Sequence, residues 1–488
     1  MQETNNTRKI LKYAISSRIL LITLIILWRS LLNPYDTSAS INPNCLSYSS
    51  QSTKPPILLP SISSAIEDSI VWDSVYFVRI AQCGYEYEQT YAFFPLLPIL
   101  IFLLSNSVFW PLIPIIGFRA VLGLSGYVIS NVAFVLAALY FYRLSVVILK
   151  DPDAALRASI LFCFNPASIF YSSIYTESLY ALLSIGGTYL LMSGANNFSV
   201  VLFALSGLSR SNGVVNAGYY GFNALHLSYY AMYVKKRAYL VLQVLLAGAL
   251  RCICIFIPFL AFQAYGYYNI CHGRNPDEMR PWCKAKVPLL YGFIQSHYWG
   301  VGFLRYFQFK QIPNFLLASP VLSLAFCSIL SYSKVNPKSF FSLGLGADLK
   351  KKYSPAFQPS GREEPLSDDH LYVTRQDAVN LRQRQKSKTQ VTSLSPSESQ
   401  VSVKAGYYSA DVLPFIYHLS FMTAMAFFVM HVQVATRFLS ASPPVYWFAS
   451  DLMKSAGKSR RWAFLIWAYA ACYILLGSLL FSNFYPFT

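Results

Sequence analysis

Charged side chains are scarce in this chain. They make up only 12% of its 488 residues, against 55% hydrophobic residues, whereas a soluble domain usually carries about 25% charged residues. The sequence also lacks a glycine-rich nucleotide loop, a His-x-x-x-His pair and a soluble domain that could hold a sugar nucleotide. We therefore expect neither a metal ion nor another cofactor. The composition predicts an all-α polytopic membrane protein, built as a single multi-spanning domain over residues 1–488.

The net charge of +18 does not indicate a nucleic-acid partner, because the basic residues fall between apolar stretches instead of forming one patch. Membrane topology and contact with phosphate-bearing lipids explain it better. Aromatic residues, at 16%, suit membrane interfaces and stack on sugars. Nine cysteines are scattered along the chain. Cys271 and Cys283 fall in one polar loop, where a disulfide in an oxidising lumen and two free thiols are both open interpretations.

Eleven stretches are apolar enough to be candidate spanning helices, each of about 20 residues or somewhat less. They are 10–32, 115–143, 157–175, 177–195, 198–217, 217–234, 239–266, 314–333, 411–430, 463–484 and the shorter 441–456. Basic residues favour the cytosolic side of a membrane. Arg8, Lys9 and Lys12 therefore place the N-terminus in the cytosol.

Residues 33–114 are then expected to form a lumenal loop followed by a segment that does not cross. That segment, 92–114, contains prolines that break regular helix, namely Pro95, Pro98, Pro111 and Pro114. We predict a re-entrant or interfacial segment over a cavity. Residues 267–313 form a second expected lumenal loop, and the polar stretch 334–410 is predicted to be a disordered cytosolic loop.

Polar residues cluster at five places that this topology brings to the lumenal side. The 267–313 loop carries several cations although it is expected to be lumenal. Either the charge rule is only statistical, or these cations meet the anionic headgroup of a substrate. The candidate site residues are Trp72, Asp73, Glu177, Arg210, Asn212, Gln295, His297, Gln433 and Arg437, with His431 beside the last two. Alternative interpretations stay open: Arg210 as a structural arginine bonded to Glu177, Glu177 as a helix cap, and the histidines as structural.

Glycosyl transfer from a lipid phosphate needs the residue types in these clusters. Asp73 can act as general base for an acceptor hydroxyl. Trp72 is expected to shape the sugar site, and we assign the donor phosphate to Arg210, His297 and Arg437. Glu177, Gln295 and Gln433 are candidates for sugar hydroxyls, with Asn212 also expected to bind substrate. One base opposite the leaving group implies direct displacement with inversion.

The chain resembles the phosphatidylinositol-glycan class V family, GPI mannosyltransferase 2, in ordered motifs over most of its length. They are Trp72-Asp73-x-x-x-Phe77-x-x-Ile80-Ala81, Gly84-Tyr85-x-Tyr87-Glu88, Ala92-Phe93-Phe94-Pro95-x-x-Pro98, Pro166-Ala167 through Tyr175-x-Glu177, Arg210-Ser211-Asn212-Gly213, Gln295-x-His297-Tyr298-Trp299 and His431-x-Gln433-Val434-x-Thr436-Arg437-Phe438. In that family the Trp-Asp pair lies in the first lumenal loop and is expected to be essential, which matches Trp72 and Asp73.

The resemblance implies a GT-C glycosyltransferase of the endoplasmic reticulum membrane with a lumenal active site. Its substrates would be dolichyl-phosphate mannose and a GPI precursor that receives its second mannose in α-1,6 linkage. We leave open a small membrane partner subunit. The alternatives are another lipid-phosphate-sugar transferase, such as a protein O-mannosyltransferase, and a lipid-sugar transporter or scramblase. The lack of an internal repeat argues mildly against an inverted-repeat transporter.

Overall fold

Every regular element in the part of the chain that the structure describes is a helix, which confirms the all-α prediction. The computed structural model describes residues 2–35, 45–46, 56–275, 277, 279–345, 406–454 and 459–485. Six helices are long and apolar enough to cross a membrane. They are α1 (Gln2–Leu31), α6 (Phe118–Leu149), α12 (Ala238–Cys271), α14 (Ile312–Val335), α18 (Leu413–Phe428) and α21 (Ser459–Ser482), where the spans of α14 and α18 include the helical turns before them, from Phe309 and from Ala410.

The remaining expected spans are shorter helices, so the count of eleven is not confirmed. The longer of them have 10 to 17 residues: α9 (Glu177–Met192), α10 (Asn196–Ser209), α11 (Ala217–Tyr233) and α20 (Pro443–Leu452). The other α-helices are α2 (Pro60–Asp68), α3 (Asp73–Cys83), α4 (Leu96–Ser105), α5 (Ile113–Ile116), α7 (Pro152–Cys163), α8 (Ser168–Ser172), α13 (Leu290–His297), α15 (Pro337–Phe341) and α19 (Ala435–Leu439).

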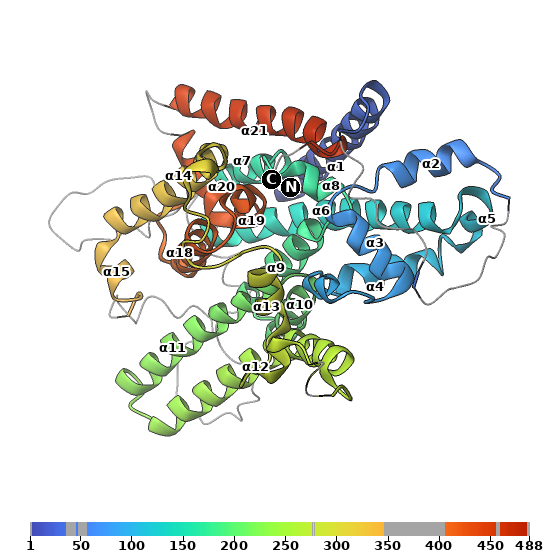
Figure 1. Cartoon of the computed structure of the whole chain (residues 1–488). Coiled ribbons are helices and arrows are strands. Elements are labelled where there is room, and N and C mark those ends of the chain that lie inside the picture. Colours follow the sequence, from blue (N-terminus) through green and yellow to red (C-terminus); the bar gives the residue numbers. More distant parts are fainter. Residues whose placement is uncertain are drawn as a thin grey trace, which may run out of the picture.

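Helix α6 is the centre of the packing. It contacts α9, α7, α1 and α4, and its buried face joins the largest apolar core. Figure 1 shows α1 and α21 along the top, α2 to α5 on the right, and α11 with α12 as a pair at the lower left. The candidate site lies near the middle of the molecule and is lined by residues of α3, α13 and α19 and of the ends of α9 and α10.

The expected single span at 157–175 is wrong. Helix α7 ends at Cys163, and α8 begins at Ser168. The cause is Pro166, which disfavours helical backbone at Asn165 and removes a donor from the next turn. Because the helix breaks, the turn between α8 and α9 brings Tyr175 and Glu177 to the interior of the protein.

The proline-containing segment 92–114 is broken, as its sequence predicts. Leu96–Ser105 and Trp110–Ile116 meet at 67°, a geometry that fits a broken span or a re-entrant loop. Pro111 and Pro114 begin the short helical turns of the second part, where a missing N–H has no cost. That the segment does not cross the membrane stays a prediction. Most of the stretch 334–410 lies outside the described residues, although α14 and α15 extend into its start.

Two disulfides tie down the loops around the centre. Cys271, the last residue of α12, is joined to Cys283, so the structure resolves the pairing that the sequence left open. Cys45 is joined to Cys83 at the end of α3, a pairing that the sequence analysis did not anticipate. Cys83 ends α3 and Cys271 lies before α13, and both α3 and α13 contribute residues to the candidate site.

Candidate active site

A cavity of about 310 Å³ lies where α3, α13, α19 and the ends of α9 and α10 meet. Polar and aromatic side chains share its wall. Most of the predicted site residues line it, and these are Asp73, Glu177, Arg210, Asn212, Gln295 and Arg437. Residues more than 350 positions apart in the chain, such as Asp73 and Arg437, are in direct contact there. The fold therefore assembles most of the expected polar clusters into one site.

Asp73 presents its carboxylate at the beginning of α3, where the helix dipole favours a negative charge. Its backbone N–H donates to the Tyr175 hydroxyl at 3.1 Å, which fixes the start of the helix. Arg437 Nη1 donates to Asp73 Oδ2 at 3.2 Å. The Asp73 side chain is 36% exposed, so its carboxylate remains open to the cavity.

Trp72 is placed away from the cavity, in contrast to its expected role at the sugar site. Its backbone has a φ of 55°, a left-handed conformation that costs about 1–3 kcal/mol in a non-glycine residue. The indole Nε1 donates to the Phe481 carbonyl at 3.1 Å, and the ring packs against Phe484. Trp72 thus anchors the start of α3 to the end of α21, while Asp73 faces the cavity.

The second carboxylate of the cavity is buried between two arginines. Glu177 is only 2% exposed and forms an ion pair with Arg210. Arg437 Nη1 lies 3.9 Å from Glu177 Oε1, so Arg437 bridges the two acids. Two carboxylates and two guanidinium groups balance in charge, which makes the buried cluster tolerable. The structure thus contains the Arg210–Glu177 contact that the alternative interpretation of Arg210 assumed.

Aromatic rings complete the cavity wall. The Arg437 guanidinium lies 5.3 Å from the Phe170 ring and 5.7 Å from the Tyr175 ring, which are cation–π distances. Burial, and secondarily the charge of Asp73, raises the pKa of Tyr175 well above its usual range, so the phenol stays protonated. Tyr175 is therefore a hydrogen-bonding group and cannot serve as the base.

Five buried polar side-chain atoms of cavity-lining residues form no hydrogen bond within the described part of the chain. They are Ser209 Oγ, Asn212 Nδ2, Arg437 Nε and both carboxylate oxygens of Glu177, of which Oε1 is ion-paired with the arginines. Buried polar groups are nearly always hydrogen-bonded in folded proteins. These atoms therefore retain hydrogen-bonding capacity that the described residues leave unsatisfied.

A family model described as "Mannosyltransferase (PIG-V)" matches residues 7–488. The chain belongs to the PIG-V mannosyltransferase family. It is 28% identical to the human GPI alpha-1,6-mannosyltransferase 2 over 92% of this chain and 84% of that protein. It is also 27% identical to the GPI mannosyltransferase 2 of Drosophila melanogaster over 86% of each chain.

A solved oligosaccharyltransferase from Archaeoglobus fulgidus, crystallised with zinc and sulfate, is similar to this PIG-V family member with 14% identity and a TM-score of 0.37. The alignment covers 96% of this chain and 53% of that one. At this score the likeness is too weak to support a shared fold. The GT-C type that the sequence motifs imply therefore stays a prediction.

Besides Trp72, two predicted residues of this PIG-V chain lie outside the cavity lining. His297 is the last residue of α13 and stacks on Phe293 with ring centroids 4.9 Å apart. Gln433 accepts a hydrogen bond from the Tyr306 hydroxyl. His431 lines the cavity instead, and its Nε2 lies 2.7 Å from the Trp299 carbonyl oxygen. The structure thus favours His431 over its sequence neighbour Gln433 and over His297 as a residue of the site.

Several aromatic residues of the cavity were not singled out as site residues. Phe93 and Trp299 belong to the motifs that carry the PIG-V resemblance, which was the signal available for them, whereas Tyr76 falls at an unspecified position of the Trp72-Asp73 motif. Tyr76 and Phe93 are stacked, with ring centroids 4.6 Å apart. Tyr291 gave no signal, because it lies in an ordinary apolar stretch. A sugar ring could lie against any of these faces.

The expected cations of the 267–313 loop do not converge on the cavity. Arg280 forms an ion pair with Glu88. The others are exposed and absent from the cavity lining, namely Arg274, Lys284, Lys286, Arg305 and Lys310. Among the described residues, the one cluster of potential metal ligands within reach of a single ion is Cys45, Cys83 and Glu86, and its cysteines are disulfide-bonded.

Proposed function

We propose that this chain transfers mannose from dolichyl-phosphate mannose to a GPI precursor, forming the α-1,6 linkage of the second mannose with inversion. The proposal rests on relatives named for this activity, which align with nearly the whole chain. One structural observation carries it. Asp73, the exposed carboxylate of the cavity, contacts Arg437, which also approaches the buried Glu177–Arg210 pair.

In the proposed reaction the acceptor hydroxyl gives its proton to Asp73 as its oxygen attacks the anomeric carbon of the donor mannose. The bond from that carbon to the phosphate oxygen breaks, and the phosphate leaves with the electron pair. Protonation of Asp73 removes the negative charge opposite Arg437. Arg437 is then free to stabilise the charge that grows on the leaving phosphate, with Arg210 beside Glu177 as a second cation.

The roles of the two acids follow from their exposure. Glu177 is 2% exposed and Asp73 is 36% exposed, so only Asp73 is readily reached by an acceptor. Glu177 instead holds both arginines in place. Ser209, Asn212 and Gln295 are proposed to bind sugar hydroxyls, since they line the cavity. Both acids are already paired with arginines, so we propose that the reaction needs no metal ion.

We propose that the cavity faces the lumen of the endoplasmic reticulum. Disulfides form and persist in oxidising compartments and are rare in the cytosol. Both disulfides are attached to elements of the cavity, through Cys83 at the end of α3 and through Cys271 at the end of α12, before α13. A lumenal cavity agrees with this chemistry and with the charge pattern of the sequence.

Complementation of cells that lack the second GPI mannose tests the proposal. The wild-type chain should restore GPI-anchored proteins at the cell surface, and Asp73→Asn should not, although it reaches the membrane in equal amount. Asp68→Asn is a matched control, because Asp68 is exposed on α2 and does not line the cavity. Rescue by Asp73→Asn would refute the base assignment. Failure of the wild type would favour a different acceptor or a transport role.

A further inference from the structure

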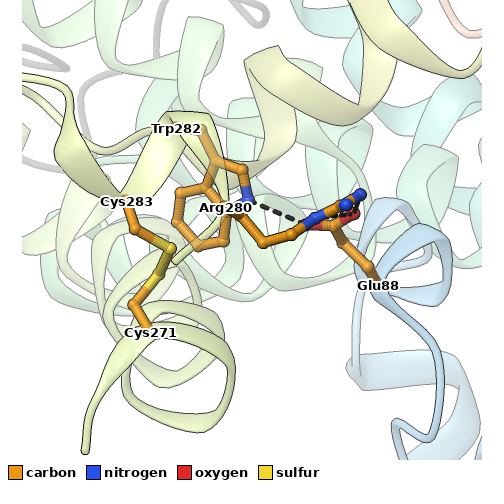
Figure 2. The surroundings of a disulfide bond; sticks show 5 residues. All are labelled: Glu88, Cys271, Arg280, Trp282 and Cys283. Carbon is orange, nitrogen blue, oxygen red and sulfur yellow. Dashed lines mark hydrogen bonds and ion pairs between the residues drawn. A yellow bond between two sulfur atoms is a disulfide. The ribbon is translucent and has the colours of Figure 1, made fainter. Parts of the chain in front are cut away.

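Glu88, a carboxylate outside the cavity, collects three hydrogen-bond donors. Its side chain, at the start of the η1 turn (Glu88–Ala92), is 12% exposed. It accepts hydrogen bonds from Trp282 Nε1 at 2.8 Å and from the Tyr298 hydroxyl at 2.7 Å, and it forms an ion pair with Arg280. Figure 2 shows Arg280 and Trp282 reaching Glu88 from the segment that the disulfide closes. We call these four residues the Glu88 clamp.

The Glu88 clamp joins two walls of the cavity that are distant in sequence. On one side, the η1 turn ends at Ala92 and continues into Phe93, which lines the cavity. On the other side, Tyr298 is followed directly by Trp299, which also lines it. The rings of Phe93 and Trp299 meet edge to face with centroids 6.2 Å apart. The spacing of these two walls therefore depends on what holds η1 against the end of α13.

The disulfide and an apolar cluster support the clamp from behind. The Cys271–Cys283 bond closes the segment that carries Arg280, and Cys283 is adjacent to Trp282. Both cysteines are buried together with Phe94, Trp282, Leu290 and Ile294, so the clamp, the disulfide and the cavity wall share one packed cluster. The clamp does not include Asp73 or Arg437, which lie on α3 and α19.

We propose that Glu88 is a positioning residue, which acts through the clamp to hold the Phe93 and Trp299 walls at the spacing that fits the acceptor saccharide. This inference rests on the proposed function, because it names how the same cavity selects its acceptor. Glu88 touches neither the substrate nor the reacting atoms. Its loss should therefore weaken acceptor binding and leave the chemical step nearly unchanged.

The test measures acceptor KM and kcat with purified protein, dolichyl-phosphate mannose and a synthetic GPI precursor that carries one mannose. Glu88→Gln keeps the side-chain shape and removes the charge. We expect it to raise the acceptor KM by roughly tenfold and to change kcat by less than about twofold. Arg280→Gln should have the same effect, and the double variant should be no worse than either single variant. Arg274→Gln, an exposed cation of the same segment, should leave both constants unchanged.

Binding of the same synthetic precursor, measured by the shift in thermal unfolding, gives a readout that does not need turnover. If the wild type binds the precursor without transferring mannose, the proposed function fails while Glu88→Gln still tests the clamp. The inference would be overturned if Glu88→Gln and the wild type had equal precursor binding and equal KM, or if the variant lost only kcat. It would also be overturned if the wild type did not bind the precursor. If Glu88→Gln does not fold, Tyr298→Phe removes one donor and should raise KM by about two- to threefold.

Discussion

Asp73 and Glu177 show how two carboxylates in one cavity come to differ. Both approach Arg437, but Asp73 begins a helix at the open side, whereas Glu177 is enclosed by Arg437 and Arg210. Asp73 is therefore exposed enough to exchange a proton with an acceptor. Glu177 is enclosed and instead holds the two arginines in place. From the sequence alone, both carboxylates were candidate site residues. Their burial could not be predicted, because it depends on residues that are distant in the chain.

Glu177→Gln tests this division at the level of stability. It leaves two partly buried arginines with one carboxylate, and breaking a fully buried ion pair typically costs about 3–5 kcal/mol, which is an upper bound here. We expect a clearly lower Tm for the purified variant as well as a loss of transfer. Glu67→Gln is the control, because its contact with Arg119 is longer, at 3.7 Å, and Glu67 is 36% exposed, so we expect a smaller loss of stability. Equal Tm changes in the two variants would contradict the assignment.

Trp72 marks the limit of residue-level prediction from the sequence. The Trp-Asp pair was recognised as important, and Asp73 does line the cavity. The direction of the indole depends on a positive φ at Trp72, a conformation that tryptophan rarely adopts. No pattern in the sequence predicts it. Likewise, the sequence favoured His297 as a phosphate ligand, but His297 ends α13 outside the cavity lining, and His431 lines the cavity.

At the scale of elements, the break between α7 and α8 is held by an arginine that the sequence analysis did not single out. Arg18, within α1, is 3% exposed. It donates to the Ser168 carbonyl at 3.1 Å and to the Ser172 hydroxyl at 2.8 Å, and its guanidinium lies 3.7 Å from the Phe134 ring. Arg18 thereby satisfies groups around α8, which leads into the turn that carries Tyr175.

Arg18→Lys should lower both Tm and transfer activity, because an ammonium group cannot reproduce the forked hydrogen bonds of a guanidinium. Thermal unfolding and the transfer assay measure the two effects. Arg8→Lys, at an exposed position of the same helix, should be neutral. An Arg18→Lys variant with wild-type Tm and activity would show that the break at Pro166 is stable without this support.

The Glu88 clamp should make the stability of the folded protein sensitive to acid. Burial alone would raise the pKa of Glu88, but hydrogen bonds from Arg280, Tyr298 and Trp282 outweigh it and hold the pKa below its ordinary value of 4.5. A carboxylate with a depressed pKa stabilises the folded state above its unfolded pKa, and this contribution is lost as the pH falls through the folded pKa. Thermal unfolding measured between neutral pH and pH values below 4.5 should show this loss for the wild type and a smaller one for Glu88→Gln. Identical pH profiles would contradict the ion pair.

At the scale of the whole molecule, the sequence predicted the all-α class, the family and most of the residues that meet in the cavity. Hydropathy and charge suffice for the long spans, because those signals are local. The number of crossings could not be fixed, since several of the expected spans correspond to helices of only 10 to 17 residues. The Cys45–Cys83 pairing depends on loop geometry that spacing does not encode.

The orientation in the membrane has its own test. Glycosylation of an engineered Asn-x-Ser/Thr site occurs only in the lumen, so it reports on which side a loop lies. A site introduced at exposed Lys286, before α13, should be glycosylated, whereas one at exposed Lys236, between α11 and α12, should not. The gel shift on glycosidase treatment measures both. The reverse pattern would place the cavity on the cytosolic side.

Mannose transfer by the purified protein is the most direct test of the central claim, that Asp73 and the arginine pair catalyse the reaction in this cavity. The assay combines dolichyl-phosphate mannose with a GPI precursor that carries one mannose. The wild type should form the α-1,6-linked product with or without a metal chelator, and Asp73→Asn should be slower by about 10²–10⁴-fold. Product formation by Asp73→Asn at the wild-type rate, or no new glycosidic bond with the wild type, would contradict the account.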